Sequence, residues 1–201
     1  MSTRTYYDAV AHGLPHDPLK AIVAPRPIGW ISTYADDGTP NLAPYSFFNL
    51  VSDSPKIVMF ASVGWKDSAT HAVERGAFAV NLATYELRDA VNGSSRPLSR
   101  GRSEFEAIGC EPEPCRSVDA PMLAEAAAVL ECRTTQSLSP TTLDGTEGEA
   151  VIVLGQVVGY HIADRLMSDG VFDSAAARPI ARLGHNDYAV VDEVFEMRRP
   201  G

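Results

Sequence analysis

Strand-like patterns dominate the first half of the chain. Apolar and β-branched residues gather in runs separated by turn residues, at Lys20–Tyr34, Asn41–Val51, Pro55–Ser62 and Ala77–Ala83. Short runs of this kind, bounded by glycine, proline and aspartate, are typical of β-strands. Prolines interrupt the first two runs, and they confine the segment near Arg26 to a sheet edge or a bulge because proline cannot donate a ladder hydrogen bond. Asp36-Asp37-Gly38 predicts a hairpin turn between these two runs.

The helical signals are fewer and shorter. A helix is expected to begin at Asp67 or Ser68, which are both good N-cap residues, and to end at Arg75 before Gly76. Short helices are also expected at Tyr85–Asn92 and Glu104–Ala107, and strands return at Ala126–Leu138, Ala150–Ala163 and Ile180–Val191. Regular strand–helix alternation is missing after residue 92, so the pattern favours a β-barrel with helical decoration over a doubly wound sheet.

Length and composition fit one soluble globular domain spanning 1–201. Within it, residues 93–121 are rich in Ser, Gly, Pro, Arg and Glu and predict a long excursion, a feature typical of lids and interfaces. The net charge of −9 argues against nucleic acid as a partner. The N-terminus has no apolar signal region, and no run approaches the roughly 18 apolar residues of a membrane span, so we expect a cytoplasmic protein that binds no membrane.

Common catalytic and metal-binding motifs are missing from the sequence. There is no dinucleotide-binding glycine motif after the first strand, no phosphate-binding Walker loop, no nucleophile elbow and no paired-histidine zinc motif. Cys110, Cys115 and Cys132 lack the spacing of a zinc site, and the five histidines are scattered. We therefore expect reduced thiols, no metal ion and no catalytic side chain of the acid, base or nucleophile kind.

The junction after Pro55–Ser62 has the features of an anion site. Ser62, Lys66, Ser68 and Thr70 fall around the start of the expected helix, where backbone N–H groups have no partner within the helix. Lys66 stands at the positive end of the helix dipole, which is unfavourable unless an anion is bound there. A lysine that extends into solvent beside a well-capped helix would explain the same residues.

Other polar residues are embedded in the strand patterns. Arg26 lies between two prolines that fix its backbone, and it suits either bidentate phosphate contact or a surface ion pair. Ser46–Asn49 places two aromatic rings between two hydrogen-bonding side chains. Asn81 interrupts an apolar strand, so it is either a hydrogen-bonded core amide or a ligand contact. The segment Arg178–Tyr188 combines arginine, histidine and tyrosine and is typical of a site or an interface.

Together, several segments resemble the flavin reductase-like, FMN-binding split-barrel family. The resemblance covers roughly residues 14 to 191, and its motifs are Ala24–Thr33, Asn41–Asn49, Ser62–Ser68, Phe78–Leu82 and Arg178–Tyr188. It implies a mainly β, FMN-binding split β-barrel of Greek-key type with a few peripheral helices. It also implies a homodimer that holds FMN near its interface. Members of this family often pass hydride from NAD(P)H to flavin, to serve a partner oxygenase or another acceptor.

The resemblance assigns roles residue by residue. Ser62, Lys66, Asp67 and Ser68 match the phosphate site, and Ser46, Phe47, Phe48 and Asn49 match the strand along the ribityl chain and the isoalloxazine ring. Arg26, Pro27 and Ile28 match the opening flavin-side motif, and Asn81 matches a polar contact near the ring. Position and density add His161, Arg182 and Tyr188 on the flavin or substrate side. The segment 164–191 is accordingly expected near the site or the dimer interface.

Three functions remain open at this point. The leading one is an NAD(P)H-dependent flavin reductase, in which the cofactor supplies the redox chemistry and no catalytic side chain is required. The second is an FMN-binding electron-transfer or flavin-storage protein without NAD(P)H turnover. The third is a split barrel that binds another phosphorylated ligand or none. A barrel without a ligand would have no use for the cation of Lys66 at a helix start. No nicotinamide-binding motif identifies the reductant.

Overall fold

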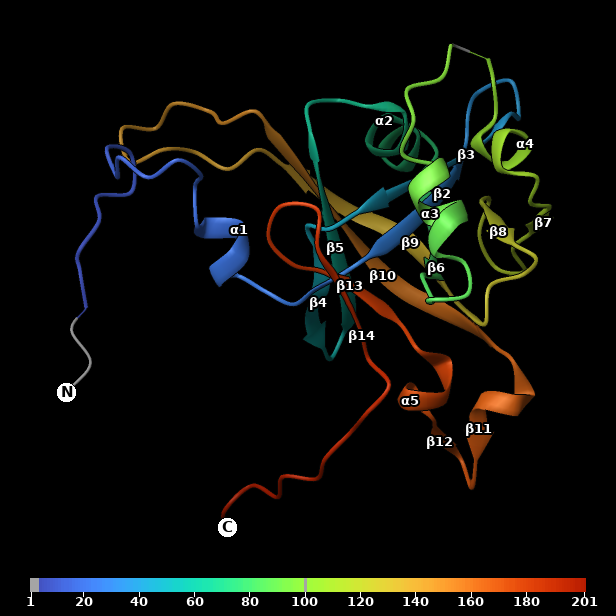
Figure 1. Cartoon of the computed structure of the whole chain (residues 1–201). Helices are drawn as coiled ribbons and strands as arrows, with labels where there is room; N and C mark the ends of the chain where they lie inside the picture. Colours follow the sequence, from blue (N-terminus) through green and yellow to red (C-terminus); the bar gives the residue numbers. More distant parts are fainter. Residues whose placement is uncertain (1–3, 100) are drawn as a thin grey trace.

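One curled antiparallel sheet forms the body of the molecule in the computed structural model, which describes residues 4–99 and 101–201 (Figure 1). Its seven strands follow the order β3-β2-β6-β9-β10-β5-β4. Their bounds are β2 Gly29–Tyr34, β3 Pro40–Tyr45, β4 Phe48–Asp53, β5 Lys56–Val63, β6 Ala77–Leu82, β9 Ala128–Leu138 and β10 Ala150–Ile162. The expected mainly β split barrel with few helices is confirmed.

Smaller sheets complete the barrel and its margins. A three-stranded sheet joins β1 (Arg26–Pro27), β13 (Ile180–Arg182) and β14 (Tyr188–Val190), with Arg26 opposite Arg182. Two further pairs are β7 (Pro112–Pro114) with β8 (Pro121–Leu123), and β11 (Met167–Ser168) with β12 (Val171–Phe172). The pairing of β1 with β13 brings the two ends of the chain to one side of the barrel.

The helices are short and peripheral. They are α1 Leu19–Ile22, α2 Asp67–Glu74, α3 Arg88–Gly93, α4 Glu104–Ile108 and α5 Ser174–Ala177, with a 3-10 turn at Asp164–Leu166. In Figure 1, α2, α3 and α4 gather at one end of the sheet, whereas α1 lies apart from them beside the N-terminal arm. The terminal segment 191–201 extends away from the barrel (Figure 1).

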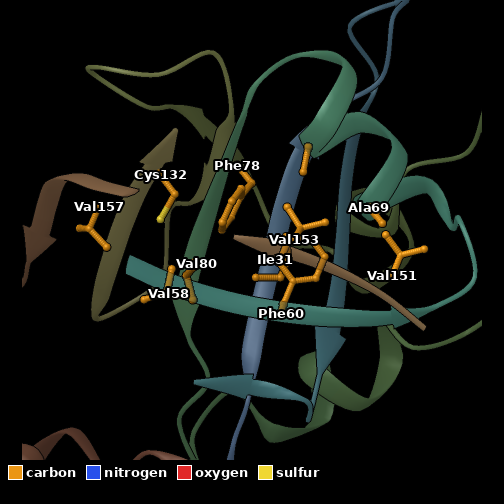
Figure 2. Packing of buried hydrophobic residues seen from close by; sticks show 11 residues of the cluster. Ile31, Val58, Phe60, Ala69, Phe78, Val80, Cys132, Val151, Val153 and Val157 are labelled. Atoms are coloured by element: carbon orange, nitrogen blue, oxygen red, sulfur yellow. The ribbon is translucent and has the colours of Figure 1, made fainter. Parts of the chain in front are cut away.

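The hydrophobic core fills the inside of the curl. Figure 2 shows Ile31, Phe60, Phe78 and Val153 converging from four strands of the sheet. The rings of Phe60 and Phe78 meet edge to face, with centroids 5.3 Å apart and planes at 76°, an arrangement that aromatic pairs favour. A second cluster on the other side of β2 includes the fully buried Trp30, so β2 is covered on both faces and its residues Gly29–Thr33 are all buried.

Proline-rich segments depart most from the predicted elements. Residues 20–22 belong to α1 and were wrongly assigned to a strand. The run Asn41–Val51 is two strands that separate at Ser46 and Phe47, not at Pro44. Pro44 lies within β3 opposite Trp30, which is tolerated because β3 is an edge strand of the sheet.

Element boundaries also shift at helices and in the second half. Helix α2 begins at Asp67 as expected, but its N-cap residue is Lys66 and no side chain caps it. The helix expected at Tyr85–Asn92 is the shorter α3, and the run Ile180–Val191 is the hairpin of β13 and β14. The excursion 93–121 holds α4 as expected and also the unpredicted β7, while its residue 100 lies outside the described residues.

Candidate functional site

A cavity of about 660 Å³, here called the main cavity, opens where the ends of β3 and β5 meet β1 and the loop after β13. Its volume falls within the roughly 300–1,000 Å³ of small-molecule sites. The lining brings together several residues that the sequence predicted for a site: Arg26, Ser46, Phe47, Lys66 and Arg182. These residues come from both ends of the chain and from its middle, so the fold assembles them.

The main cavity is strongly basic. Lys20, Arg26, Lys66 and Arg182 line it, against the acidic Asp17. This charge is concentrated in a chain whose net charge is −9. A concave surface lined by one sign of charge focuses its electrostatic field and attracts ligands of the opposite sign. The cavity therefore suits an anionic ligand.

Lys66 is positioned by a tight turn between β5 and α2. Gly64 has a φ of +72°, a conformation that glycine adopts without strain, and its carbonyl accepts a hydrogen bond of 3.0 Å from the Lys66 N–H. The Lys66 side chain is exposed and forms no ion pair within the described part of the chain. The first-turn N–H groups of α2 beside it also lack partners within the helix. The Lys66 ammonium and the N–H groups at the start of α2 together have the features of an anion site.

An unpaired hydroxyl lies next to this turn. Ser62 on β5 is 1% exposed, and its Oγ has no hydrogen-bond partner among the described residues. Its neighbours Ala61 and Val63 both line the main cavity. Buried polar atoms are nearly always hydrogen-bonded. Ser62 shares the buried face of β5 with Val58 and Phe60, so its side chain points into the barrel, whereas Ala61 and Val63 face the main cavity.

Two more hydroxyl groups surround this position. Burial raises the pKa of Tyr45, and the hydroxyls of Ser68 and Ser62 oppose that rise, which places the phenol beside both. The Ser68 hydroxyl donates to Asn41 Oδ1 at 2.8 Å, so its proton already has an acceptor. Asn41 in turn donates to Glu104 Oε2 at 3.0 Å, which ties α4 to β3. The chain thus fixes the Ser68 hydroxyl, whereas the Ser62 hydroxyl has no hydrogen-bond partner among the described residues.

Arg26 lines the main cavity but directs its guanidinium elsewhere. The side chain is 8% exposed, and both η nitrogens donate to backbone carbonyl oxygens. Nη1 donates to the carbonyls of Lys20 and Val23, and Nη2 donates to the carbonyl of Leu183 at 2.8 Å. The sequence suggested a phosphate contact for Arg26. The structure instead shows its η nitrogens bound to the main chain.

A groove of about 500 Å³ adjoins the main cavity and shares Arg26, Ser46 and Phe47 with it. Its other lining residues include Pro27, Phe48, Asn49, Met59 and apolar side chains of α1. Phe47 is 41% exposed and offers a bare aromatic face. Flat aromatic ligands pack well on such surfaces. Cavity and groove together offer a basic end and an apolar end.

Other predicted site residues lie elsewhere. Ile28, Asn81 and His161 line an apolar cavity of about 310 Å³, which shares Pro27 and Phe48 with the groove. Asn81 is fully buried, donates to Trp30 O at 3.0 Å and to Ser32 Oγ at 2.9 Å, and accepts from a backbone N–H. It is a satisfied core amide, and the structure does not bring it beside Lys66.

Asp67, Ser68 and Tyr188 lie around the main cavity without lining it. The first two line a hollow of about 620 Å³ on the other side of Lys66, formed with the loop after α3. Tyr188 supports Arg182, because its hydroxyl oxygen lies 2.7 Å from Arg182 Nη1 and the guanidinium stacks 4.7 Å above its ring.

Several residues of the site were not predicted. Lys20 and the loop 183–185 line the main cavity, and Tyr45 approaches the hydroxyl cluster. Tyr45 stands beside Ser46 within the motif that carried the resemblance, which was the available signal. Lys20 gave no such signal, because an exposed lysine in a short helix looks like any surface residue.

The described residues contain neither a metal-ligand cluster nor a helix that could span a membrane. Within 4–99 and 101–201, no group of three His, Cys, Asp or Glu side chains could hold a metal ion. Across the same ranges, no helix has the length and hydropathy of a membrane span. The cysteines are free thiols, and burial raises the pKa of Cys115 to about 12, so this thiol is a poor nucleophile at neutral pH.

Comparisons with known proteins identify the family and the fold of the chain. Residues 23–179 match the family described as flavin reductase like domain. The uncharacterised protein BH2278 of Halalkalibacterium halodurans is 38% identical over 90% of this chain and 89% of its own length. The nitrilotriacetate monooxygenase component B of Bacillus cereus has a TM-score of 0.87 at 26% identity, covering 98% of this chain and 100% of its own. Flavoredoxin of Desulfovibrio vulgaris (Miyazaki F), at 18% identity, a TM-score of 0.78 and coverage of 87% and 91%, shares the fold.

Proposed function

The chain belongs to the flavin reductase-like family, and on this basis we propose that it is an FMN-binding oxidoreductase of flavin reductase type. FMN, when bound, would accept hydride from NAD(P)H and pass electrons on to an acceptor or a partner protein. The observation that carries the proposal is Lys66 at the start of α2, which forms no ion pair among the described residues and lines a basic cavity.

In this proposal the residues around Lys66 hold the phosphate group. A flavin phosphate is dianionic near neutral pH and needs a cation together with several N–H or O–H donors. The Lys66 ammonium and the first-turn N–H groups of α2 supply them. Asp67 and Ser68 take part through their backbone N–H groups, because the Ser68 hydroxyl already donates to Asn41.

The segment Ser46–Asn49 and the adjoining groove would receive the rest of the cofactor. Ser46 lines both the main cavity and the groove, where a hydroxyl can bind the polar ribityl chain. Phe47 and Phe48 offer apolar surface to the ring system, together with Pro27 and α1. The chain thus provides an anion site, a polar stretch and an apolar surface in the order that FMN requires.

We further propose that the single domain 1–201 works as a homodimer and that an oxygenase or another acceptor takes the electrons. The similarity to a monooxygenase component B supports a partner of this kind. The exposed apolar side chains of α1, with Leu19 60% and Ile22 75% exposed, support burial of this side against another chain.

Reduction of the bound flavin tests the proposed activity. Purified protein loaded with FMN is mixed with NADH or NADPH without oxygen, and the visible absorbance of the oxidised flavin is followed. We expect the bands to bleach with at least one nucleotide within the time of enzymatic turnover. A flavin-loaded protein that bleaches with dithionite but with neither nucleotide would instead be an electron-transfer or flavin-storage protein.

A further inference from the structure

We propose that Arg26 is a positioning residue that holds two walls of the main cavity together and does not bind the flavin phosphate. The inference rests on the proposed function, because it concerns the same cavity. It begins from the three main-chain carbonyls that accept hydrogen bonds from Arg26. Two of them, on Lys20 and Val23, belong to α1 and its C-cap, and the third belongs to Leu183 in the loop after β13.

Both walls need an external support. Helix α1 has only four residues, and none of them is buried. A helix this short is not stable by itself. The loop 183–185 follows the two-residue pairing of β13 with β1 and is held by its own turn, in which the Leu183 N–H donates to Asp187 O at 2.9 Å. Each wall is thus a small segment that is only weakly stabilised by its own contacts.

The two walls also touch each other beside Arg26. The loop after β13 runs next to α1 (Figure 1), and a Cβ placed on Gly184 would lie 2.7 Å from the Cβ of Ala21. This spacing leaves no room for a side chain, so glycine permits the close approach. Ala21 and Gly184 both line the main cavity, together with Lys20 and Leu183. A shift of either wall would change the shape of the cavity.

The chemistry of the guanidinium suits this role. Arginine presents several N–H donors in one rigid plane, and it can hold carbonyl groups that converge from different segments. Lysine carries the same charge on a compact ammonium and cannot reproduce that geometry. Three of the five N–H groups of Arg26 donate to carbonyls of the two walls, and Nε has no hydrogen-bond partner among the described residues. A phosphate bound to Nη1 would have to displace the α1 wall. The positive charge remains and still contributes to the field of the cavity.

Comparing FMN with riboflavin separates the two possible roles, since riboflavin lacks the phosphate. The dissociation constants of both ligands are measured for the wild type, Arg26→Lys and Lys66→Ala by flavin fluorescence or absorbance titration. We expect Arg26→Lys to weaken both ligands by a similar factor of about ten, equivalent to one net hydrogen bond. Lys66→Ala should weaken FMN alone. Weaker FMN binding with unchanged riboflavin binding in Arg26→Lys would overturn the inference and make Arg26 a phosphate ligand.

Hydrogen exchange of the flavin-free protein provides a readout that is independent of the cofactor. Arg26→Lys should speed amide exchange in residues 19–23 and 183–187, and leave the core strands β6 and β9 protected. Arg75→Lys is the matched control, because Arg75 also joins two segments, through Asp119 and the Ala35 carbonyl, away from the cavity. Unchanged exchange in both walls would contradict the inference even if the protein binds no flavin.

A second variant covers the case in which Arg26→Lys does not fold. Gly184→Ala keeps Arg26 and forces the walls apart at Ala21. It should weaken FMN and riboflavin equally, as expected for a change of cavity shape. Wild-type binding of both ligands by Gly184→Ala would show that the contact between the walls does not control the site, and would overturn the inference.

Discussion

The residues that matter most in this molecule are those whose polar side-chain groups are either hydrogen-bonded within the fold or left without a partner. Lys66 at the start of α2 forms no ion pair among the described residues, and the Ser62 hydroxyl on β5 has no hydrogen-bond partner there. Arg26 and Asn81 looked equally available in the sequence, yet both η nitrogens of Arg26 and the whole side-chain amide of Asn81 are hydrogen-bonded, while Nε of Arg26 has no partner among the described residues. Sequence alone identified the residue types of a binding site but not which of them remain free for a ligand.

Glu131 is the opposite case, a buried carboxylate that no sequence motif singles out. It is 1% exposed and accepts hydrogen bonds from the backbone N–H groups of Arg116 and Ser117 at 2.7 and 2.6 Å. His161 contacts its other side at 2.5 Å. Burial raises the pKa of Glu131, but the hydrogen bonds from His161 and the two N–H groups together outweigh it and lower the pKa.

This lowered pKa predicts a pH-dependent contribution to stability. The ionised carboxylate stabilises the fold fully above its ordinary pKa of 4.5, and this stabilisation is lost as the pH falls through the lower native value. Glu131→Gln should therefore lower the free energy of unfolding at pH 7 by about 1.5–3 kcal/mol, with a smaller difference at pH 3. Urea unfolding measures it, with Glu113→Gln on the exposed β7 as the control. A difference that stays constant from pH 7 to pH 3 would contradict the assignment.

Elements without proline were predicted well, and elements with proline were not. The runs Pro55–Ser62 and Ala77–Ala83 became β5 and β6 within about a residue, because their apolar pattern is continuous. Around Pro25, Pro44 and Pro112 the local signal opposes strand formation, and long-range pairing with β13, β2 and β8 decides the outcome. Such pairing cannot be derived from one sequence, which is why β7 was missed. Helix α1 was missed because its apolar residues belong to a run that resembles a strand.

Strand β10 allows a packing test at the scale of a whole element. A Cβ on Gly155 would lie 2.4 Å from the ring of Phe78, whereas a Cβ on Gly159 of the same strand would meet Glu131 at an ordinary 3.5 Å. Gly155→Ala should therefore destabilise the protein by about 1–3 kcal/mol through overpacking, and Gly159→Ala should have little effect. Thermal unfolding compares them. Equal melting temperatures for the two variants would show that the Phe78 ring moves aside for the added methyl group without loss of stability.

At the scale of the whole molecule, the fold brings distant segments to one basic cavity. Lys20 comes from α1, Arg26 from β1, Lys66 from the junction of β5 and α2, and Arg182 from the C-terminal hairpin. The sequence predicted the fold class, which is confirmed, and a local motif suggested the anion site that we propose. It could not predict that β1 pairs with β13, and the shape of the cavity depends on that pairing.

The most direct test of the account is the affinity of the purified, flavin-stripped protein for FMN and for riboflavin. We predict saturable binding of FMN with a perturbed visible spectrum, and weaker binding of riboflavin by about ten- to a hundred-fold, because a charged phosphate contact contributes about 1.5–3 kcal/mol. Lys66→Ala should remove this preference, and Lys56→Ala, whose side chain pairs with Asp53 on the surface, should keep it. A protein that binds neither flavin, or binds both equally in the wild type, would contradict the central claim.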